Sequence, residues 1–202
     1  MTKPYFGRLL TAMVTPFNED GSINYAAGAD FAKWLLANGS DGLVVEGSTG
    51  EAATMNMDEK IKFMETIVKR VNGRAKIVAG AGTNCTASTI ELVQKMEACG
   101  VDGLLVVGPY YNKPTQEGYY QHFAAVAKAT KLPIIVYNVP GRTGGNIAPA
   151  TIARLAKDFS NIVAVKEAAG NVAQTAELYR VLPEDFSIYS GDDGLILPFM
   201  SV

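Results

Sequence analysis

Short runs of apolar, largely β-branched residues recur along the chain, each followed by a Gly-rich or polar turn and then an amphipathic stretch. Within each run the residues are apolar without interruption, which is typical of strands covered on both faces. From the second run onward the runs begin about 30 residues apart, the length of one strand and one helix with their turns. The predicted strands are 9–16, 42–46, 77–80, 103–108, 133–138, 162–166 and 186–190.

The segments between these strands carry the signals of helix ends. Asn56 is followed three residues later by Glu59, the pattern of a capping box at a helix start. Apolar residues then recur at helical spacing as far as Gly73, which suits a helix exit. Further helices are predicted to begin near Thr86, Thr115 and Asn171.

Strands that alternate with helices indicate an α/β fold with a parallel sheet and right-handed crossovers. The spacing fits both a closed (β/α)8 barrel and a doubly wound open sheet, and it favours the barrel only slightly. Residues 1–202 are predicted to form one catalytic domain. A barrel of this type has about 250 residues, so we expect the eighth strand and any later segment to lie outside this sequence.

Lys166 stands at the end of an apolar strand, in Val-Ala-Val-Lys-Glu-Ala. Burial there would remove water from its ammonium group and lower its pKa, which makes a neutral amine available. Such an amine attacks ketones and forms an imine, an electron sink for carbon–carbon bond chemistry. The alternative is a lysine whose stem packs against the strand while its ammonium group reaches water.

Other polar residues follow the ends of other predicted strands. Ser48 and Thr49 lie on a turn between glycines, and their hydroxyl and backbone N–H groups suit a carboxylate or a phosphate. Tyr137 is placed to move protons, and Arg142 offers a planar fork for a carboxylate. A plain turn, a tyrosine at the edge of the core and a solvated arginine are the alternatives.

Composition and charge argue against several classes of function. A formal net charge of −2 without a basic stripe argues against nucleic acid as a partner. Every apolar run is shorter than the roughly 20 residues that cross a bilayer, and the first residues lack the pattern of a signal peptide. Two cysteines and one histidine give neither a disulfide framework nor a metal site, so we expect a reducing compartment, the cytoplasm.

Five motifs resemble, in the same order, those of the dihydrodipicolinate synthase / N-acetylneuraminate lyase family of class I aldolases. The similarity extends from about Leu9 to the last residue. The motifs are Gly-Ser-Thr-Gly-Glu (47–51), Gly-Pro-Tyr-Tyr-Asn-Lys-Pro (108–114), Tyr-Asn-Val-Pro-Gly-Arg-Thr-Gly (137–144), Val-Ala-Val-Lys-Glu-Ala (163–168) and Ser-Gly-Asp-Asp (190–193).

The resemblance implies a (β/α)8 TIM barrel, here lacking the eighth strand and the C-terminal helical segment. It implies that Lys166 forms a Schiff base with pyruvate. Tyr137 is then implied to transfer protons, helped by the hydroxyl of Thr49 or Ser48 and by Tyr111 of a neighbouring subunit.

Substrate contacts are implied in the same way. Ser48, Thr49 and their backbone amides are implied to hold the pyruvate carboxylate, and Arg142 the carboxylate of aspartate semialdehyde. Gly191 is implied to form part of the wall of the site. The product would be 4-hydroxy-tetrahydrodipicolinate, on the route to diaminopimelate and lysine. The resemblance also implies a homotetramer, and no metal or organic cofactor, because the imine does the electronic work.

Three further hypotheses stay open. Family synthases usually carry two threonines where this chain has Ser48 and Thr49, so another pyruvate-dependent 2-oxo-acid aldolase is an alternative. A catalytically silent, truncated chain that binds an oxo acid or a partner protein is the second. An unrelated barrel enzyme that binds phosphate at the Ser48 turn is the third.

Weak or absent feedback inhibition by lysine is predicted from the same resemblance. Lysine-sensitive relatives carry histidines at the positions of Met57 and Lys60 and a glutamate at that of Ser88, while Asn84 and Tyr110 are retained here. The glutamate carboxylate is absent here and a cation lies nearby. Both changes disfavour binding of a cationic amino acid such as lysine. Activity measured across a lysine titration checks this, and strong inhibition at low millimolar lysine would contradict it.

Overall fold

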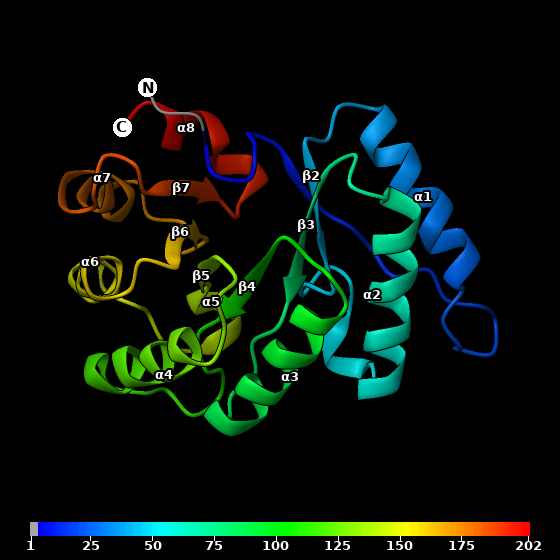
Figure 1. Ribbon diagram of the computed structural model, residues 1–202. Helices are drawn as coiled ribbons and strands as arrows, with labels where there is room; N and C mark the ends of the chain where they lie inside the picture. Colours follow the sequence, from blue (N-terminus) through cyan, green and yellow to red (C-terminus); the bar gives the residue numbers. More distant parts are fainter. Residues whose placement is uncertain (1–3) are drawn as a thin grey trace.

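The computed structural model describes residues 4–202, and these form one seven-stranded sheet in which all neighbouring strands are parallel (Figure 1). The strands lie side by side in the order in which they occur along the chain. They are β1 (Leu10–Ala12), β2 (Gly42–Val45), β3 (Lys76–Gly80), β4 (Gly103–Val107), β5 (Ile134–Asn138), β6 (Ile162–Glu167) and β7 (Ser187–Ser190).

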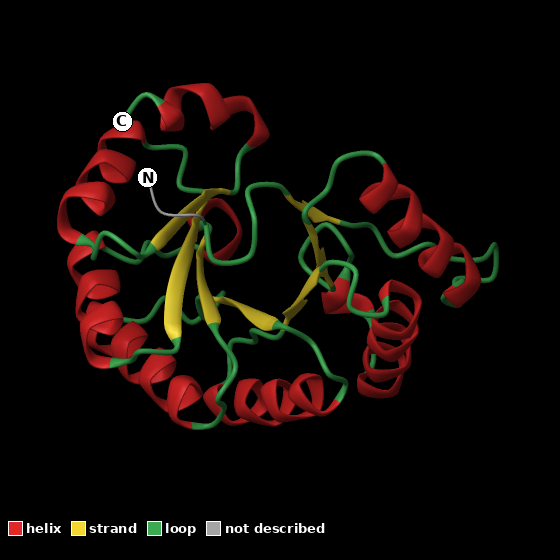
Figure 2. Cartoon of the chain, turned by 45° about the horizontal axis from the view of Figure 1, so that its top comes forward, coloured by secondary structure: helices red, strands yellow, loops and turns green. Residues whose placement is uncertain are grey.

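This strand order decides between the two architectures that the spacing allowed. A doubly wound sheet reverses its strand order at a switch point, whereas the order here never reverses. Figure 2 shows the strands along an arc with helices outside it, as in a TIM barrel. The described residues therefore supply seven strands of a (β/α)8 barrel, and the barrel prediction is confirmed.

Helices connect the successive strands, and α8 follows the last strand. They are α1 (Tyr25–Ala37), α2 (Met57–Val71), α3 (Thr86–Ala98), α4 (Gln116–Lys128), α5 (Pro140–Thr143), α6 (Pro149–Asp158), α7 (Val172–Val181) and α8 (Ile196–Met200), with 3-10 turns at Ala52–Thr54 and Asp193–Leu195. Within residues 4–202, every helix is too short or too polar to cross a lipid bilayer.

The helix starts follow the expected capping chemistry. Asn56 Oδ1 accepts from the backbone N–H of Glu59 at 3.0 Å, and Glu59 Oε2 accepts from the N–H of Asn56 at 2.9 Å, which completes the capping box. Thr115 and Asn171 cap α4 and α7 in the same manner. The prediction for β1 was too long: after Ala12 the chain leaves the sheet, and Phe17 pairs with Ile23 instead.

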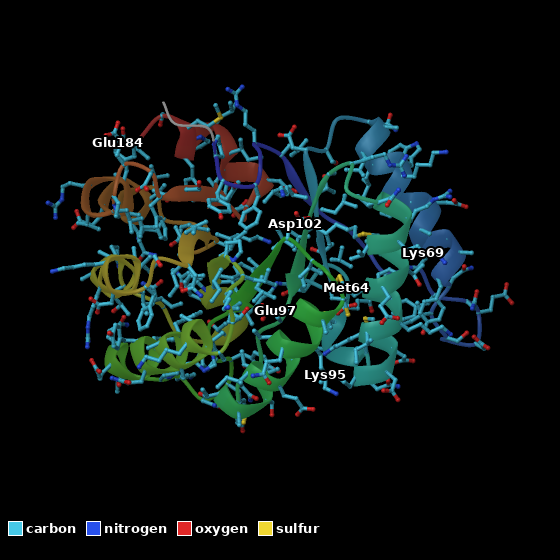
Figure 3. The ribbon with its side chains drawn as sticks, viewed as in Figure 1. Met64, Lys69, Lys95, Glu97, Asp102 and Glu184 are labelled. Atoms are coloured by element: carbon cyan, nitrogen blue, oxygen red, sulfur yellow. The ribbon has the colours of Figure 1, made fainter. Side chains whose placement is uncertain are left out.

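Side chains of the strands alternate between two apolar layers. One layer lies between strands and helices and includes Met64 of α2, which is fully buried, whereas Lys69 of the same helix is exposed (Figure 3). The other layer fills the inside of the arc and includes Val44, Val78 and Ile135. The alternation explains the uninterrupted apolar runs, because each strand is covered on both faces.

Candidate active site

The end of β6 places Lys166 directly beside Tyr137 of β5. The two residues are partners in the parallel ladder, and Lys166 Nζ lies 4.4 Å from the centre of the Tyr137 ring. A register shift between Ile134 and Ile135 of β5 comes before this pair and sets which side chains of β6 face inward. Along β5 itself the alternation is unbroken, so Tyr137 belongs to the layer inside the arc and its neighbour Val136 to the layer under the helices.

Burial controls the protonation of the lysine. Loss of water around the half-buried side chain lowers the pKa of Lys166; Asp193 opposes this effect and Arg142 adds to it. The ring of Tyr137 favours the ammonium form through a cation–π contact but does not replace a full hydration shell. The net shift increases the fraction of neutral amine near neutral pH.

Tyr137 carries the second titratable group of the site. Burial raises the pKa of Tyr137, while Arg142 and the nearby Ser48 hydroxyl act in the opposite direction. The phenol is 6% exposed, so near neutral pH it stays protonated and can both donate and accept a proton. A buried tyrosine that shares a cavity with a serine hydroxyl suits proton transfer.

The turn after β2 presents unused hydrogen-bond donors. Within it, the N–H groups of Gly50 and Glu51 donate to the carbonyls of Gly47 and Ser48. Among the described residues, the N–H groups of Ser48 and Thr49 donate to no acceptor. Two free amides with two adjacent hydroxyls form a site for a carboxylate.

These elements enclose a small cavity of about 180 Å³. Pockets for drug-sized ligands hold roughly 300–1,000 Å³, so this cavity suits a substrate of few heavy atoms. Six of the seven residues predicted from the sequence line it. The lining consists of Ala12, Gly47, Ser48, Thr49, Tyr137, Val139, Arg142, Lys166, Ala168, Gly191 and Asp192.

Gly191 closes the wall beside the lysine. A Cβ atom at this position would lie 2.8 Å from Ala168 Cβ and 3.0 Å from Lys166 Cε. Only glycine therefore lets the end of β7 approach the lysine stem without displacing it. Its backbone N–H donates to the carbonyl of Glu167 at 2.7 Å, which fixes this approach.

Arg142 and Tyr111 lie toward the outside. Arg142, in α5, is exposed and lines the small cavity and a neighbouring one of about 340 Å³, so its guanidinium is available to an anion. Tyr111 is 88% exposed, has a left-handed backbone with φ of 69°, and does not line either cavity. Its expected role in a neighbouring subunit stays a prediction.

The part of the chain that the structure describes holds no preformed metal-binding site. Across residues 4–202, no three His, Cys, Asp or Glu side chains cluster as metal ligands would. The two cysteines, Cys85 and Cys99, are free thiols.

Glu46, a buried acid next to the site, is not among the residues predicted from the sequence. Glu46 follows β2 with a left-handed backbone, φ 58°, and its side chain is 2% exposed. Both carboxyl oxygens lack a hydrogen-bond partner among the described residues. Burial raises the pKa of Glu46 to about 8, and Lys60 opposes that rise. The only signal in the sequence is an acid at the end of an apolar strand, directly before Gly47.

Comparison with known proteins identifies the family. The sequence profile of the Dihydrodipicolinate synthetase family matches residues 5–202. The chain belongs to this family. It is 56% identical over 197 residues to the 4-hydroxy-tetrahydrodipicolinate synthase of Desulforamulus reducens, covering 98% of this chain and 67% of the relative. It is 59% identical to the synthase of Heliobacterium modesticaldum, covering 98% of this chain and 65% of that relative.

Solved structures of the family have the same fold. The Bacillus anthracis dihydrodipicolinate synthase superposes with a TM-score of 0.95 at 44% identity, covering 98% of this chain and 68% of that one. The Cyanidioschyzon merolae enzyme, solved with lysine bound, gives a TM-score of 0.96 at 45% identity, with the same coverage of both chains. The chain thus spans about two thirds of the length of its family relatives.

Glu46 gives a prediction for stability against pH. Between the ordinary carboxyl pKa of 4.5 and about 8, the unfolded chain releases a proton that the folded chain keeps, so the free energy of unfolding falls as pH rises through this window. Glu46→Gln removes this titration. We expect the free energy of unfolding of Glu46→Gln, relative to that of wild type, to increase as pH rises through this window, by an amount on the order of a few kcal/mol.

Urea unfolding at a series of pH values measures this slope. Glu51→Gln, which removes an exposed carboxylate from the same loop, is the matched control. A constant difference between Glu46→Gln and wild type across the window would contradict the prediction.

Proposed function

We propose that this chain is a lyase that joins pyruvate to aspartate semialdehyde through an imine on Lys166, giving 4-hydroxy-tetrahydrodipicolinate for diaminopimelate and lysine biosynthesis. The observation that carries the proposal is the half-buried amine of Lys166, whose pKa burial lowers, beside a protonated Tyr137 in a cavity that also holds the Ser48 turn. Membership of the family and relatives named as this synthase support the choice of reaction.

The first steps use pyruvate alone. The free amides and hydroxyls of Ser48 and Thr49 hold its carboxylate, which aims its carbonyl carbon at Lys166. The neutral amine adds to that carbon, and loss of one water leaves a protonated imine. Removal of a proton from the methyl carbon then gives an enamine. Tyr137, with the Ser48 hydroxyl beside it, supplies the route for these protons.

The later steps use the aldehyde. The enamine carbon attacks the aldehyde carbon of aspartate semialdehyde, forming the carbon–carbon bond while the aldehyde oxygen gains a proton and becomes a hydroxyl. Arg142 at the mouth binds the carboxylate of this substrate. The amino group of the semialdehyde then attacks the imine carbon, which closes the ring and returns Lys166 as a free amine.

The proposal extends to the surroundings of the reaction. The imine serves as the electron sink, so the steps need neither a metal nor an organic cofactor. Tyr111 is exposed and therefore free to enter the site of a second copy, which supports a homo-oligomer, a tetramer by family analogy. A cytoplasmic location follows from the biosynthetic role of the family.

A second 2-oxo-acid aldolase activity is the alternative that one residue favours. Serine at position 48 keeps the hydroxyl of a threonine but lacks the methyl group that limits its rotamers. A looser relay is compatible with another acceptor aldehyde. Identification of the product formed from pyruvate and aspartate semialdehyde, compared with other aldehydes, distinguishes the two activities.

Trapping with borohydride tests the imine directly. Incubation with pyruvate and borohydride is expected to fix one reduced pyruvate on Lys166, detected by mass and by peptide mapping. Lys166→Arg removes the nucleophile and should abolish the adduct. Lys157→Arg, at an exposed position of α6, is the matched control and should keep it. An adduct on another lysine, or none in the wild type, would overturn the proposal.

A further inference from the structure

Four polar side chains form a closed hydrogen-bond network at the ends of β5 and β6. Asn138 Nδ2 lies 3.1 Å from each carboxylate oxygen of Glu167, and Gln174 Nε2 donates to Oε2 at 3.0 Å. The backbone N–H of Ala169 donates to Oε1 at 2.7 Å. Asn146 completes the circuit: its Oδ1 accepts from Asn138 at 2.8 Å, and its Nδ2 donates to Gln174 Oε1 at 2.8 Å.

The centre of this network is inaccessible to water. Glu167 is 0% exposed and Asn138 1% exposed. Both carboxylate oxygens receive N–H donors, and the described residues offer Glu167 no ion pair. A buried carboxylate is costly unless all of its acceptor positions are used, so the network is sensitive to any change in its geometry.

The network lies directly behind the reacting residues. The ladder pairs Tyr137 with Lys166 and, one step later, Asn138 with Glu167. Successive side chains of a strand point to opposite faces, so the first pair faces the cavity and the second faces the helices. Tyr137 and Lys166, which face the cavity, are therefore each bonded along the chain to a residue of the network.

The same network reaches two other parts of the site. Asn138 Oδ1 accepts from the backbone N–H of Ile147 at 3.0 Å, which ties down the segment after the α5 loop that carries Arg142. Gln174 belongs to α7, the helix after β6. One buried carboxylate thereby joins both strands, the arginine loop and a helix.

We propose that Glu167 is a positioning residue: its buried bonds to Asn138 and Gln174 fix the ends of β5 and β6 so that Lys166 and Tyr137 keep their separation and aim. This inference rests on the proposed imine chemistry. An angstrom of displacement at a reacting group costs on the order of a hundredfold in rate, so the rate of imine formation is the sensitive readout.

Glu167→Gln tests the carboxylate with little change in shape. The new amide group places N–H donors opposite those of Asn138 and Gln174, which leaves buried donors without an acceptor. We expect pyruvate-dependent borohydride trapping at saturating pyruvate to slow on the order of 10- to 100-fold per folded molecule. The concentration of pyruvate at half-saturation should change little, because the Ser48 turn is untouched.

Exchanging the carboxylate at position 167 and the amide at position 174 tests whether the trapping rate recovers. In Glu167→Gln/Gln174→Glu the carboxylate moves to position 174, where it accepts from Asn146 and from the new amide at position 167. The oxygen of that amide in turn accepts from Asn138 and Ala169. The double variant pairs positions 167 and 174 again but loses the bond from Gln174 Nε2 to Asn146 Oδ1, so it is expected to recover part of the rate. Gln174→Glu alone sets two carboxylates against each other and should be slow. Glu177→Gln, on the outer side of α7, is the control and should trap at the wild-type rate.

The outcomes separate this inference from the proposed function. A wild type without any adduct overturns both. A wild-type adduct together with an equal rate in Glu167→Gln overturns the inference alone, as does an exchange variant that regains thermal stability but not rate. Should Glu167→Gln fail to fold, Gln174→Ala removes one donor to Glu167 from a half-buried position, and a wild-type trapping rate in that variant overturns the inference.

Discussion

Lys166 is only partly in contact with water, and the chemistry proposed for the site depends on this partial burial. An exposed lysine is almost entirely an ammonium ion at neutral pH and does not attack a ketone. Here burial lowers the pKa, the Asp193 carboxylate opposes the shift, and the wall formed by Gly191 brings the end of β7 against the lysine stem. The environment therefore has to exclude water while it leaves room for a small oxo acid.

The barrel architecture meets both requirements through the alternation of side chains. At the ends of β5 and β6, the inward positions carry Tyr137 and Lys166, the pair proposed to react, and the outward positions carry the buried pair Asn138 and Glu167. Strands buried on both faces can support this arrangement, since their outer face is covered by helices that contribute partners such as Gln174. The strand ends that carry Tyr137 and Lys166 are thus joined by hydrogen bonds on the face away from the cavity.

Much of the fold could be predicted because its signals are local. The strand that carries Lys166 begins with an uninterrupted apolar run, and the helix starting after Asn56 has a complete capping box. The strand order is not local, and only the structure separated the barrel from a doubly wound sheet. Lys166, Tyr137 and Ser48 could be predicted to lie together because unusual residues at strand ends, together with ordered motifs, mark such places, and the structure puts all three around one cavity.

The remaining features depend on contacts that the sequence does not encode locally. The role of Glu167 follows from its register with Asn138 and from Gln174 on a separate helix, and nothing near Glu167 in the chain predicts either contact. In the sequence, Glu46 is only an acid at the end of a strand. Its burial and its unpartnered carboxyl oxygens are evident only in the structure. The position of Tyr111 outside the cavity likewise depends on the fold of its loop.

The most direct test of the central claim is the pKa of the Lys166 side chain itself. Nuclear magnetic resonance of protein labelled at lysine side chains, with the Lys166 signal assigned from its loss in Lys166→Arg, gives this value by pH titration. We expect a midpoint clearly below the ordinary lysine value of 10.5. A midpoint at or above 10.5 would mean that the amine remains hydrated and charged, and would contradict the account.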